Sequence, residues 1–107
     1  MEGLIGRPAE ESEARIRVRA FTTLRDALGC DEIILNMKAR ESVHDVLLKL
    51  EQVYGESVKA QLRDGVSGEF VPFLVMINNH TVPISRRQEA KVNDGDRITI
   101  LPPIDGG

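Results

Sequence analysis

The chain has 107 residues, of which 29% are charged and 41% are apolar, and its formal net charge is −3 at pH 7. This length suits one small domain with a single core, and the composition is typical of globular proteins and excludes disordered and membrane classes. No apolar stretch approaches the roughly 18 residues of a transmembrane helix, and the start of the chain lacks the basic flank and apolar region of a signal peptide. We therefore expect a cytoplasmic protein with no membrane partner.

Charge balance and cysteine usage narrow the class further. The sequence holds 17 acidic and 14 basic residues, so it gives no overall electrostatic reason to bind nucleic acid. Cys30 is the only cysteine. An internal disulfide is therefore excluded, in agreement with a reducing compartment.

The first part of the chain divides into a leader and a strand. Residues 1–14 hold four glutamates, two glycines and one proline without a sustained period, which predicts a disordered leader before a domain over residues 15–107. From Arg15, arginines at every second position alternate with Ile16, Val18 and Ala20, the period of a strand with one buried face. We interpret the arginines as a solvated sheet face.

Two helices and a second strand follow. Thr22 or Thr23 is expected to cap a short helix over Leu24–Leu28 that ends at Gly29, and Glu32–Met37 reads as the second strand. The clearest helix runs from the cap Ser42 to Tyr54, because its apolar residues recur at spacings of three and four. Asp45 completes a variant capping box with Ser42, and Gly55 suits the left-handed position that ends a helix.

The second half of the chain predicts three more strands. After a polar connection over Glu56–Glu69, with a helical turn at Val58–Leu62 and a tight turn at Asp64-Gly65, the apolar run Phe70–Ile77 favours a strand. Asn78–His80 can form a hairpin turn into a short edge strand over Thr81–Ile84. The turn Asp94–Asp96 then leads into the closing strand Arg97–Leu101.

This order of elements predicts an α+β fold. One mixed sheet of four or five strands would be crossed on one face by the main helix Ser42–Tyr54. The expected core beneath that helix consists of Val18, Phe73, Val75, Ile77, Ile98 and Ile100, and each buried large apolar side chain contributes about 1.5–3 kcal/mol in transfer terms.

The end of the chain has an unusual composition. Pro102 and Pro103 follow the closing strand directly, and the last residues are Ile104, Asp105, Gly106 and Gly107. The prolines restrict φ and hold the start of this tail extended, whereas the glycines lack a Cβ and could thread a narrow channel. Six residues beyond Leu101 can reach roughly 20 Å at about 3.3 Å each. We therefore predict a flexible C-terminal tail over residues 102–107 that enters a cleft of a partner.

These features together resemble a known family. Asp94-Gly95-Asp96, Leu101-Pro102-Pro103 and Gly106-Gly107 occur in the order found in the ubiquitin-like sulfur carriers, which include the small subunit of molybdopterin synthase and the archaeal small ubiquitin-like modifiers. The resemblance covers about residues 15–107 and implies the β-grasp fold. The connection Glu56–Glu69 is longer than in the shortest bacterial members and is more similar to the archaeal branch.

The resemblance implies a carrier function at Gly107, supported by Gly106. A free α-carboxyl is ionised at neutral pH and is a poor electrophile. In the family, an E1-like adenylating enzyme uses ATP to form an acyl adenylate there, and sulfur then displaces AMP to leave a thiocarboxylate. The thiocarboxylate donates sulfur in molybdopterin, that is molybdenum cofactor, biosynthesis, to a precursor held by the large subunit of molybdopterin synthase. The chain would then be a carrier or small subunit, with no bound cofactor or metal and no stand-alone activity.

Two other functions stay open on the sequence alone. The same activated Gly107 could be joined by an isopeptide bond to lysines of target proteins, as in a ubiquitin-like protein modifier. A binding-only β-grasp module with an accidental ending is the third possibility, and two final glycines arise by chance in roughly 0.5% of chains.

A partner surface is expected beside the tail. If Phe73, Val75 and Ile77 face the main helix, strand alternation turns Leu74 and Met76 to the other face, near Thr99 and Leu101. Exposed apolar groups of this kind mark partner contacts. The predicted partner-binding set is therefore Leu74, Met76, Leu101, Pro102, Pro103, Ile104 and Asp105.

Other chemically notable residues receive structural interpretations. We expect Cys30 to be a partly buried small residue, and His44 and His80 lack the spacing of metal ligands. Asp94 and Asp96 are expected to form a turn. The basic residues Arg86, Arg87 and Lys91 are interpreted as solvated surface.

Overall fold

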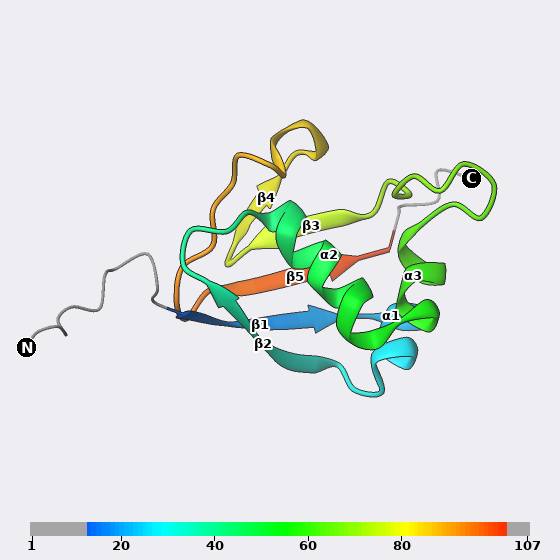
Figure 1. Ribbon diagram of the computed structural model, residues 1–107, viewed down its shortest axis with the longest axis horizontal. Helices are drawn as coiled ribbons and strands as arrows, with labels where there is room; N and C mark the ends of the chain where they lie inside the picture. The colour runs from blue at the N-terminus through cyan, green and yellow to red at the C-terminus, as the bar shows by residue number, and fades with distance from the viewer. Residues whose placement is uncertain (1–12, 103–107) are drawn as a thin grey trace, which may run out of the picture.

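The computed structural model describes residues 13–102. Along this part of the chain the elements are β1 (Glu13–Ala20), α1 (Thr22–Leu28), β2 (Glu32–Lys38), α2 (Val43–Tyr54), α3 (Glu56–Leu62), β3 (Leu74–Ile77), β4 (His80–Val82), the short 3-10 helix η3 (Ile84–Arg86) and β5 (Arg97–Leu101) (Figure 1). The order agrees with the sequence-based prediction except for α3, which was expected only as a single helical turn, and η3, which was not predicted and includes Ile84 from the expected edge strand.

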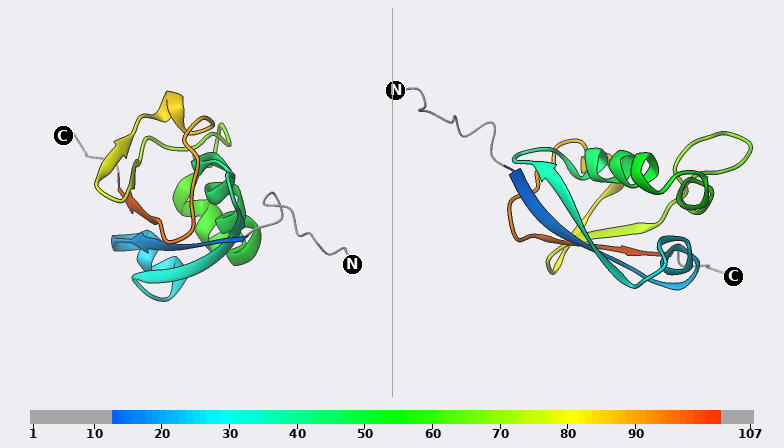
Figure 2. Two further views of the ribbon diagram at one scale, coloured as in Figure 1. Left: turned by 90° about the vertical axis from the view of Figure 1, so that its left-hand side faces the viewer. Right: turned by 60° about the horizontal axis from the view of Figure 1, so that its bottom comes forward.

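The strands form one mixed sheet in the order β2-β1-β5-β3-β4. β1 and β5 pair in parallel at its centre, and the other neighbouring strands pair antiparallel. Figure 2 shows α2 lying over one face of the sheet. The predicted α+β arrangement is therefore confirmed.

The core lies between this face and α2. Alternate residues of β1 and β5 point into it, and Val18, Val75 and Ile98 are fully buried. The buried stripe of α2 consists of Val43, Val46, Leu47 and Leu50. Of the six expected core residues, Ile77 is the exception: it is only partly buried, because β3 ends there at the hairpin.

β1 begins two residues earlier than expected. Glu13 pairs with Lys38, and Ala14 is fully buried against the core. These two residues therefore belong to the sheet and not to the predicted leader, because Ala14 extends the buried alternation of Ile16 and Val18 by one step. The rest of the predicted leader, residues 1–12, lies outside the described residues.

The N-terminus of α1 differs from the prediction. Phe21 is its N-cap and neither Thr22 nor Thr23 accepts a capping hydrogen bond; instead the Thr22 hydroxyl donates to the Phe21 carbonyl oxygen at 2.7 Å. Thr22 has a φ of 54°, which is unusual for a β-branched residue. The C-terminus is as expected, with Gly29 in the left-handed conformation.

The main helix α2 has the predicted capping box. The Ser42 hydroxyl accepts a hydrogen bond from the Asp45 N–H at 3.1 Å, and the Asp45 carboxylate accepts from the Ser42 N–H at 2.9 Å. Gly55 has a positive φ of 78°, but its ψ of −150° is not left-handed helical as predicted. The reason is that Gly55 is also the N-cap of α3, so the chain must turn rather than close a helix end.

β3 is shorter than the apolar run that predicted it. Only Leu74–Ile77 pair with β5, and of these Val75–Ile77 also pair with β4. Phe70 instead makes an isolated bridge to Arg63, and the Val71 N–H donates to the Leu62 carbonyl at 2.8 Å. Pro72 has no N–H to give to a ladder. The segment 70–73 therefore connects α3 to the sheet instead of extending it.

Two turns form at the predicted places. At the β3–β4 hairpin Asn78 has a φ of 55°, but the turn consists of Asn78 and Asn79 only, because His80 pairs with Ile77 and begins β4, which ends before Pro83. In the second turn Gly95 has a φ of 89°, the Asp94 carboxylate accepts from the Arg15 N–H at 2.8 Å, and Asp96 accepts from the Asn93 N–H at 2.8 Å. The interpretation of Asp94 and Asp96 as turn residues is confirmed.

Arg87 is buried, contrary to its interpretation as solvated surface. Its side chain is only 4% exposed, lies 4.5 Å above the Phe73 ring and donates a 2.6 Å hydrogen bond to the Phe73 carbonyl. Phe73 precedes β3 and has no partner in the β3–β4 ladder, so the guanidinium supplies a donor to a carbonyl that the ladder does not reach. Burial lowers the pKa of Arg87.

We predict that Arg87→Met lowers the free energy of unfolding by about 1–3 kcal/mol, because the methionine fills similar volume but leaves the buried Phe73 carbonyl without a donor. Urea unfolding followed by circular dichroism measures the change. The matched control is Arg86→Met, since that side chain is 68% exposed and its loss should change stability by less than about 0.5 kcal/mol. Equal effects of the two substitutions would contradict the assigned hydrogen bond.

The capping box makes stability depend on pH. Hydrogen bonding from the Ser42 backbone is the main cause that lowers the pKa of Asp45 below its usual value of 3.8. A carboxyl with a lowered folded-state pKa stabilises the fold above its unfolded-state pKa, and that contribution is lost as the pH falls through the folded-state pKa. We therefore expect wild type to be more stable than Asp45→Asn at neutral pH, and the difference to shrink once the pH falls below 3.8. Urea midpoints across this range would test it; a constant difference would contradict it.

Candidate functional site

β5 brings the chain to one end of the sheet, where α1 and α3 also lie (Figure 1). Leu101 is the last residue of β5 and is half-buried, and Pro102 follows it as an exposed residue. The tail base, defined as Leu101 and Pro102, is therefore fixed to the central strand of the fold. The other predicted tail residues, Pro103, Ile104, Asp105, Gly106 and Gly107, lie outside the described residues.

The predicted apolar pair on β3 lies beside the tail base. Leu74 pairs with Leu101 and Met76 pairs with Thr99, on the sheet face opposite α2. Leu74 is 36% exposed, and Met76 is partly exposed. The structure thus brings together Leu74, Met76 and Leu101 as predicted, in a small apolar patch on an open sheet face.

Sequence reasoning did not place Phe21 in this patch. Ala20 pairs with Ile100, so Phe21 follows on the side of β1 that faces Leu101. The Arg19 guanidinium lies 5.3 Å from the centre of the Phe21 ring, a cation–π arrangement. The alternation that puts Arg19 outward would have predicted the same face for Phe21, had the strand been extended by one residue.

A small hollow adjoins the tail base. It has a volume of about 50 Å³ and is lined by Phe21, Thr22, Thr23, Leu24, Gln61, Leu62, Phe73, Ile100, Leu101 and Pro102. Most of these groups are apolar, and they come from α1, α3 and β5. The strained Thr22 backbone and the two short helices therefore shape the surface from which the tail departs.

The loop between α3 and β3 is held by a dense set of hydrogen bonds. Its Asp64 carboxylate accepts from the N–H groups of Val66 at 2.7 Å and Ser67 at 2.9 Å, which lowers the pKa of Asp64. The carbonyl of Glu69 accepts from the Asp64 N–H at 2.8 Å. The predicted turn at Asp64-Gly65 is confirmed, and it is the start of an ordered loop.

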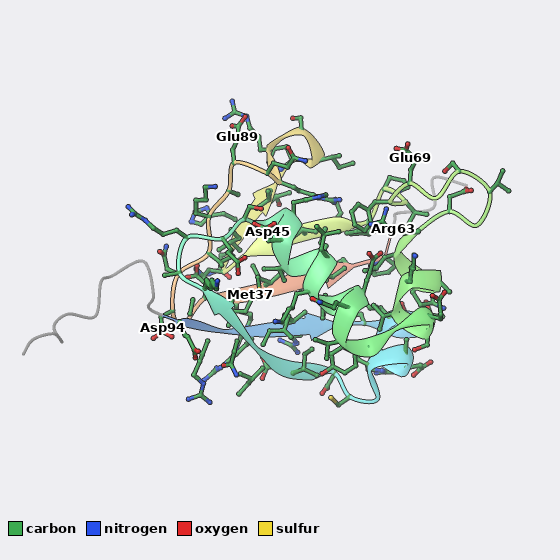
Figure 3. All side chains as sticks on the ribbon, in the orientation of Figure 1. Met37, Asp45, Arg63, Glu69, Glu89 and Asp94 are labelled. Atoms are coloured by element: carbon green, nitrogen blue, oxygen red, sulfur yellow. The ribbon has the colours of Figure 1, made fainter. Side chains whose placement is uncertain are left out.

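Arg63 anchors this loop to α2. Its Nε and second terminal nitrogen donate to the Glu51 carboxylate at 2.6 and 3.0 Å, and its remaining nitrogen donates to the Gly68 carbonyl at 2.9 Å. Hydrogen bonding to Glu51 raises the pKa of Arg63. Figure 3 shows Arg63 and Glu69 at the end of the molecule away from Asp94, which is the end where β5 also finishes.

The remaining candidate residues do not assemble into a reactive centre. Cys30 is exposed rather than partly buried, because it lies in the turn after Gly29, and its thiol donates to the Glu32 carbonyl at 3.3 Å. Within residues 13–102, no three histidine, cysteine or carboxylate side chains lie close enough to hold a metal ion. What this region offers is an open apolar patch beside the end of the central strand β5.

The helices of residues 13–102 are all too short or too polar to cross a membrane.

Comparison with known proteins identifies the lineage of the chain. The sequence profile of the ThiS family matches residues 18–107. A molybdopterin synthase sulfur carrier subunit from Dictyostelium discoideum is 27% identical over 94 residues, which cover 87% of this chain and 96% of that protein.

Solved structures give the same result. The small archaeal modifier protein 1 from Methanosarcina acetivorans is 30% identical, with a TM-score of 0.70 over 90% of this chain and 99% of that one. Subunit 1 of molybdopterin-converting factor from Helicobacter pylori, solved as a complex with subunit 2, is 24% identical, with a TM-score of 0.55 over 87% of this chain and 99% of that one. These likenesses confirm the ubiquitin-like β-grasp fold, and the chain belongs to the ThiS family, which includes sulfur carriers and ubiquitin-like modifiers.

Proposed function

We propose that this chain is a sulfur carrier for molybdopterin biosynthesis and that the carboxylate of Gly107 carries the sulfur. The observation that carries the proposal is the family match, which extends to Gly107 itself, together with the curated relative named as a molybdopterin synthase sulfur carrier subunit. The position of the tail base at the end of the central strand supports the proposal, because it fixes the point on the fold from which the following residues extend.

The proposed chemistry takes place in partner active sites. A carboxylate oxygen of Gly107 attacks the α-phosphorus of ATP in an E1-like adenylating enzyme, which releases pyrophosphate and leaves an acyl adenylate. A hydrosulfide equivalent then attacks the carbonyl carbon, AMP departs with the bonding electron pair, and a thiocarboxylate forms. Adenylation is needed because an ionised carboxylate is a poor electrophile, and ATP is a substrate of the partner rather than a cofactor of this chain.

The acceptor of the sulfur would be a pterin precursor held by a protein similar to the large subunit of molybdopterin synthase. Support comes from the Helicobacter pylori structure, in which subunits 1 and 2 of molybdopterin-converting factor form a complex. The patch of Leu74, Met76, Leu101 and Phe21 would contact these partners, and Pro102, Pro103, Ile104 and Asp105 would line the entry of the tail. The exposed free thiol of Cys30 is consistent with our proposed location in the reducing cytoplasm.

A second function is favoured by a specific likeness. The Methanosarcina acetivorans structure, at 30% identity, is named a small archaeal modifier protein. In that role a lysine amine of a target protein would attack the carbonyl carbon of the Gly107 acyl adenylate, or of a thioester formed from it with a partner's thiol. An isopeptide bond would form as AMP, or the thiol, departs with the bonding electron pair. The two functions share adenylation, and one chain can serve both.

We expect an ATP-dependent mass change at the C-terminus. After incubation with ATP, an E1-like enzyme and a sulfide donor, intact mass spectrometry should show a gain of about 16 Da, the difference between sulfur and oxygen in a covalent modification. Lysine-linked conjugates at higher mass would instead support the modifier function. Removal of Gly106 and Gly107 should abolish either product and leave the urea midpoint unchanged, because both residues lie beyond the core strands.

The opposite outcome is equally clear. If no E1-like enzyme of the same organism produces an ATP-dependent change in the intact chain, the terminal-carboxylate function is wrong and the binding-only module remains.

We also predict that Leu74→Asp weakens partner binding without unfolding the chain. The new carboxylate would lose its water when the patch is covered by the partner, and this desolvation costs binding free energy. The KM for this chain in the adenylation reaction should therefore rise by about tenfold or more. The stability should change by less than about 1 kcal/mol, because Leu74 is 36% exposed. The control is Val66→Asp, since Val66 is 99% exposed in the α3–β3 loop; equal KM values for the two variants would contradict the role of the patch.

A further inference from the structure

Four arginines gather on the sheet face opposite α2. Arg15, Arg17 and Arg19 are the exposed residues of the alternating strand β1, and Arg97 is the first residue of its parallel neighbour β5, with a side chain that is 42% exposed. We call these four residues the arginine face. It is unexpected in a chain whose net charge is −3.

The pairing within the sheet distinguishes this face from an ordinary solvated surface. Elsewhere on β1 opposite charges meet across strands, as Glu13 does with Lys38 and Arg19 with Glu32. Arg17, by contrast, pairs with Arg97. Like charges at neighbouring positions repel each other, so this pair, unlike the other two, brings no attraction between the strands.

Among residues 13–102, only one arginine of this face lies within ion-pair distance of a carboxylate: Glu32 Oε2 lies 3.5 Å from Arg97 Nε. The Asp94 carboxylate accepts the backbone N–H of Arg15 and lines the same hollow as Arg15 and Arg17. Arg15 is opposite Asn36 and Arg17 is opposite Ile34. Within residues 13–102, the side chains of Arg15 and Arg17 form no ion pair.

The arginine face is continuous with the patch beside the tail base. Arg19 pairs with Thr99, which in turn pairs with Met76, and its guanidinium covers the Phe21 ring at 5.3 Å. At the other side, Ile34 adds an apolar side chain that is 55% exposed next to Arg17. One sheet face therefore carries cationic and apolar groups up to the residue from which the tail departs.

We propose that the arginine face docks onto an acidic surface, apolar at its centre, of the adenylating protein that receives the tail. This inference rests on the proposed function and names the chemistry of its partner. The apolar side chains beside the arginines favour a protein over a nucleic acid, whose affinity comes mainly from phosphate contacts and is opposed by the negative net charge of the chain. Docking would set the direction in which the tail enters the active site.

The geometry makes the four charges act together. Neighbouring strands are about 4.8 Å apart and successive outward residues of one strand about 6.7 Å apart, whereas the screening length is about 10 Å at 0.1 M salt. The charges therefore add to one field, which accelerates association with an oppositely charged surface by 10-fold to about 10³-fold at low salt.

The test uses the full chain and the E1-like enzyme that adenylates it, with pyrophosphate release as the readout. We expect the double variant Arg15→Glu/Arg17→Glu to raise KM by about tenfold or more and to leave kcat within about twofold. Raising the salt from about 0.05 M to about 0.5 M should lower kcat/KM for wild type far more than for the variant. Arg15→Lys/Arg17→Lys should restore most of the activity, because it restores charge.

The controls separate docking from folding and from net charge. Arg86→Glu/Lys91→Glu makes the same charge change on exposed residues of another segment, and it should leave KM within about twofold. The Arg15→Glu/Arg17→Glu variant should keep a free energy of unfolding within about 1 kcal/mol of wild type, because both side chains are exposed on the sheet face. Equal KM values for the two double reversals, or a wild-type KM that ignores salt, would overturn the proposal.

Failure of this inference is distinguishable from failure of the proposed function. If wild type is adenylated but the two double charge reversals have equal KM values, the carrier function stands and the arginine face is not its docking surface. If wild type is never adenylated, both fall. If the double reversal instead weakens binding of an RNA duplex while the enzyme kinetics stay unchanged, the face recognises nucleic acid and the acidic protein surface is wrong.

Discussion

The parallel pairing of β1 with β5 is the constraint on which the rest of the molecule depends. The first and last strands of the described fold lie side by side at the centre of the sheet, and the Arg17 N–H donates to the Asp96 carbonyl at 2.9 Å where they join. Because β5 runs in the same direction as β1, Leu101 must emerge where α1 begins. The site of tail departure is therefore a consequence of topology and not of the tail itself.

The two faces of this sheet have separate tasks. The face beneath α2 holds fully buried side chains from β1, β3 and β5, such as Ile16, Val75 and Ile98, and their burial supplies most of the stability. The other face carries arginines, Leu74 and Met76, which contribute little to the fold. This division lets the open face vary its charge and apolar pattern to suit a partner without altering the core.

Polar groups repair the places where the ladder is interrupted. Pro72 and Pro83 shorten β3 and β4, and the buried guanidinium of Arg87 serves the Phe73 carbonyl that lacks a backbone donor. On the other side of the segment Phe70–Phe73, Arg63 bonds both Glu51 and Gly68 and lies 4.0 Å above the Phe70 ring. Arg63 and Arg87 thus hold the connection from α3 to β3, which its apolar sequence alone had predicted to be a strand.

The sequence by itself determined the elements whose signal is local. The alternation of β1, the capping box of Ser42 and Asp45, the turn at Gly95 and the outward side of Leu74 and Met76 all follow from periods and turn chemistry that act over a few residues. The final glycines likewise come from the sequence alone, and so does the resemblance that gives them a role.

Only the tertiary structure decided what depends on distant partners. Arg87 was interpreted as surface because nothing near it in the sequence reveals that it packs on Phe73 and donates to the Phe73 carbonyl. The Arg17–Arg97 pair, the place of Phe21 beside Leu101 and the hollow at the tail base arise from the register of β1 on β5, which joins residues about eighty positions apart. Periodicity says which way a side chain points, but register says what it meets.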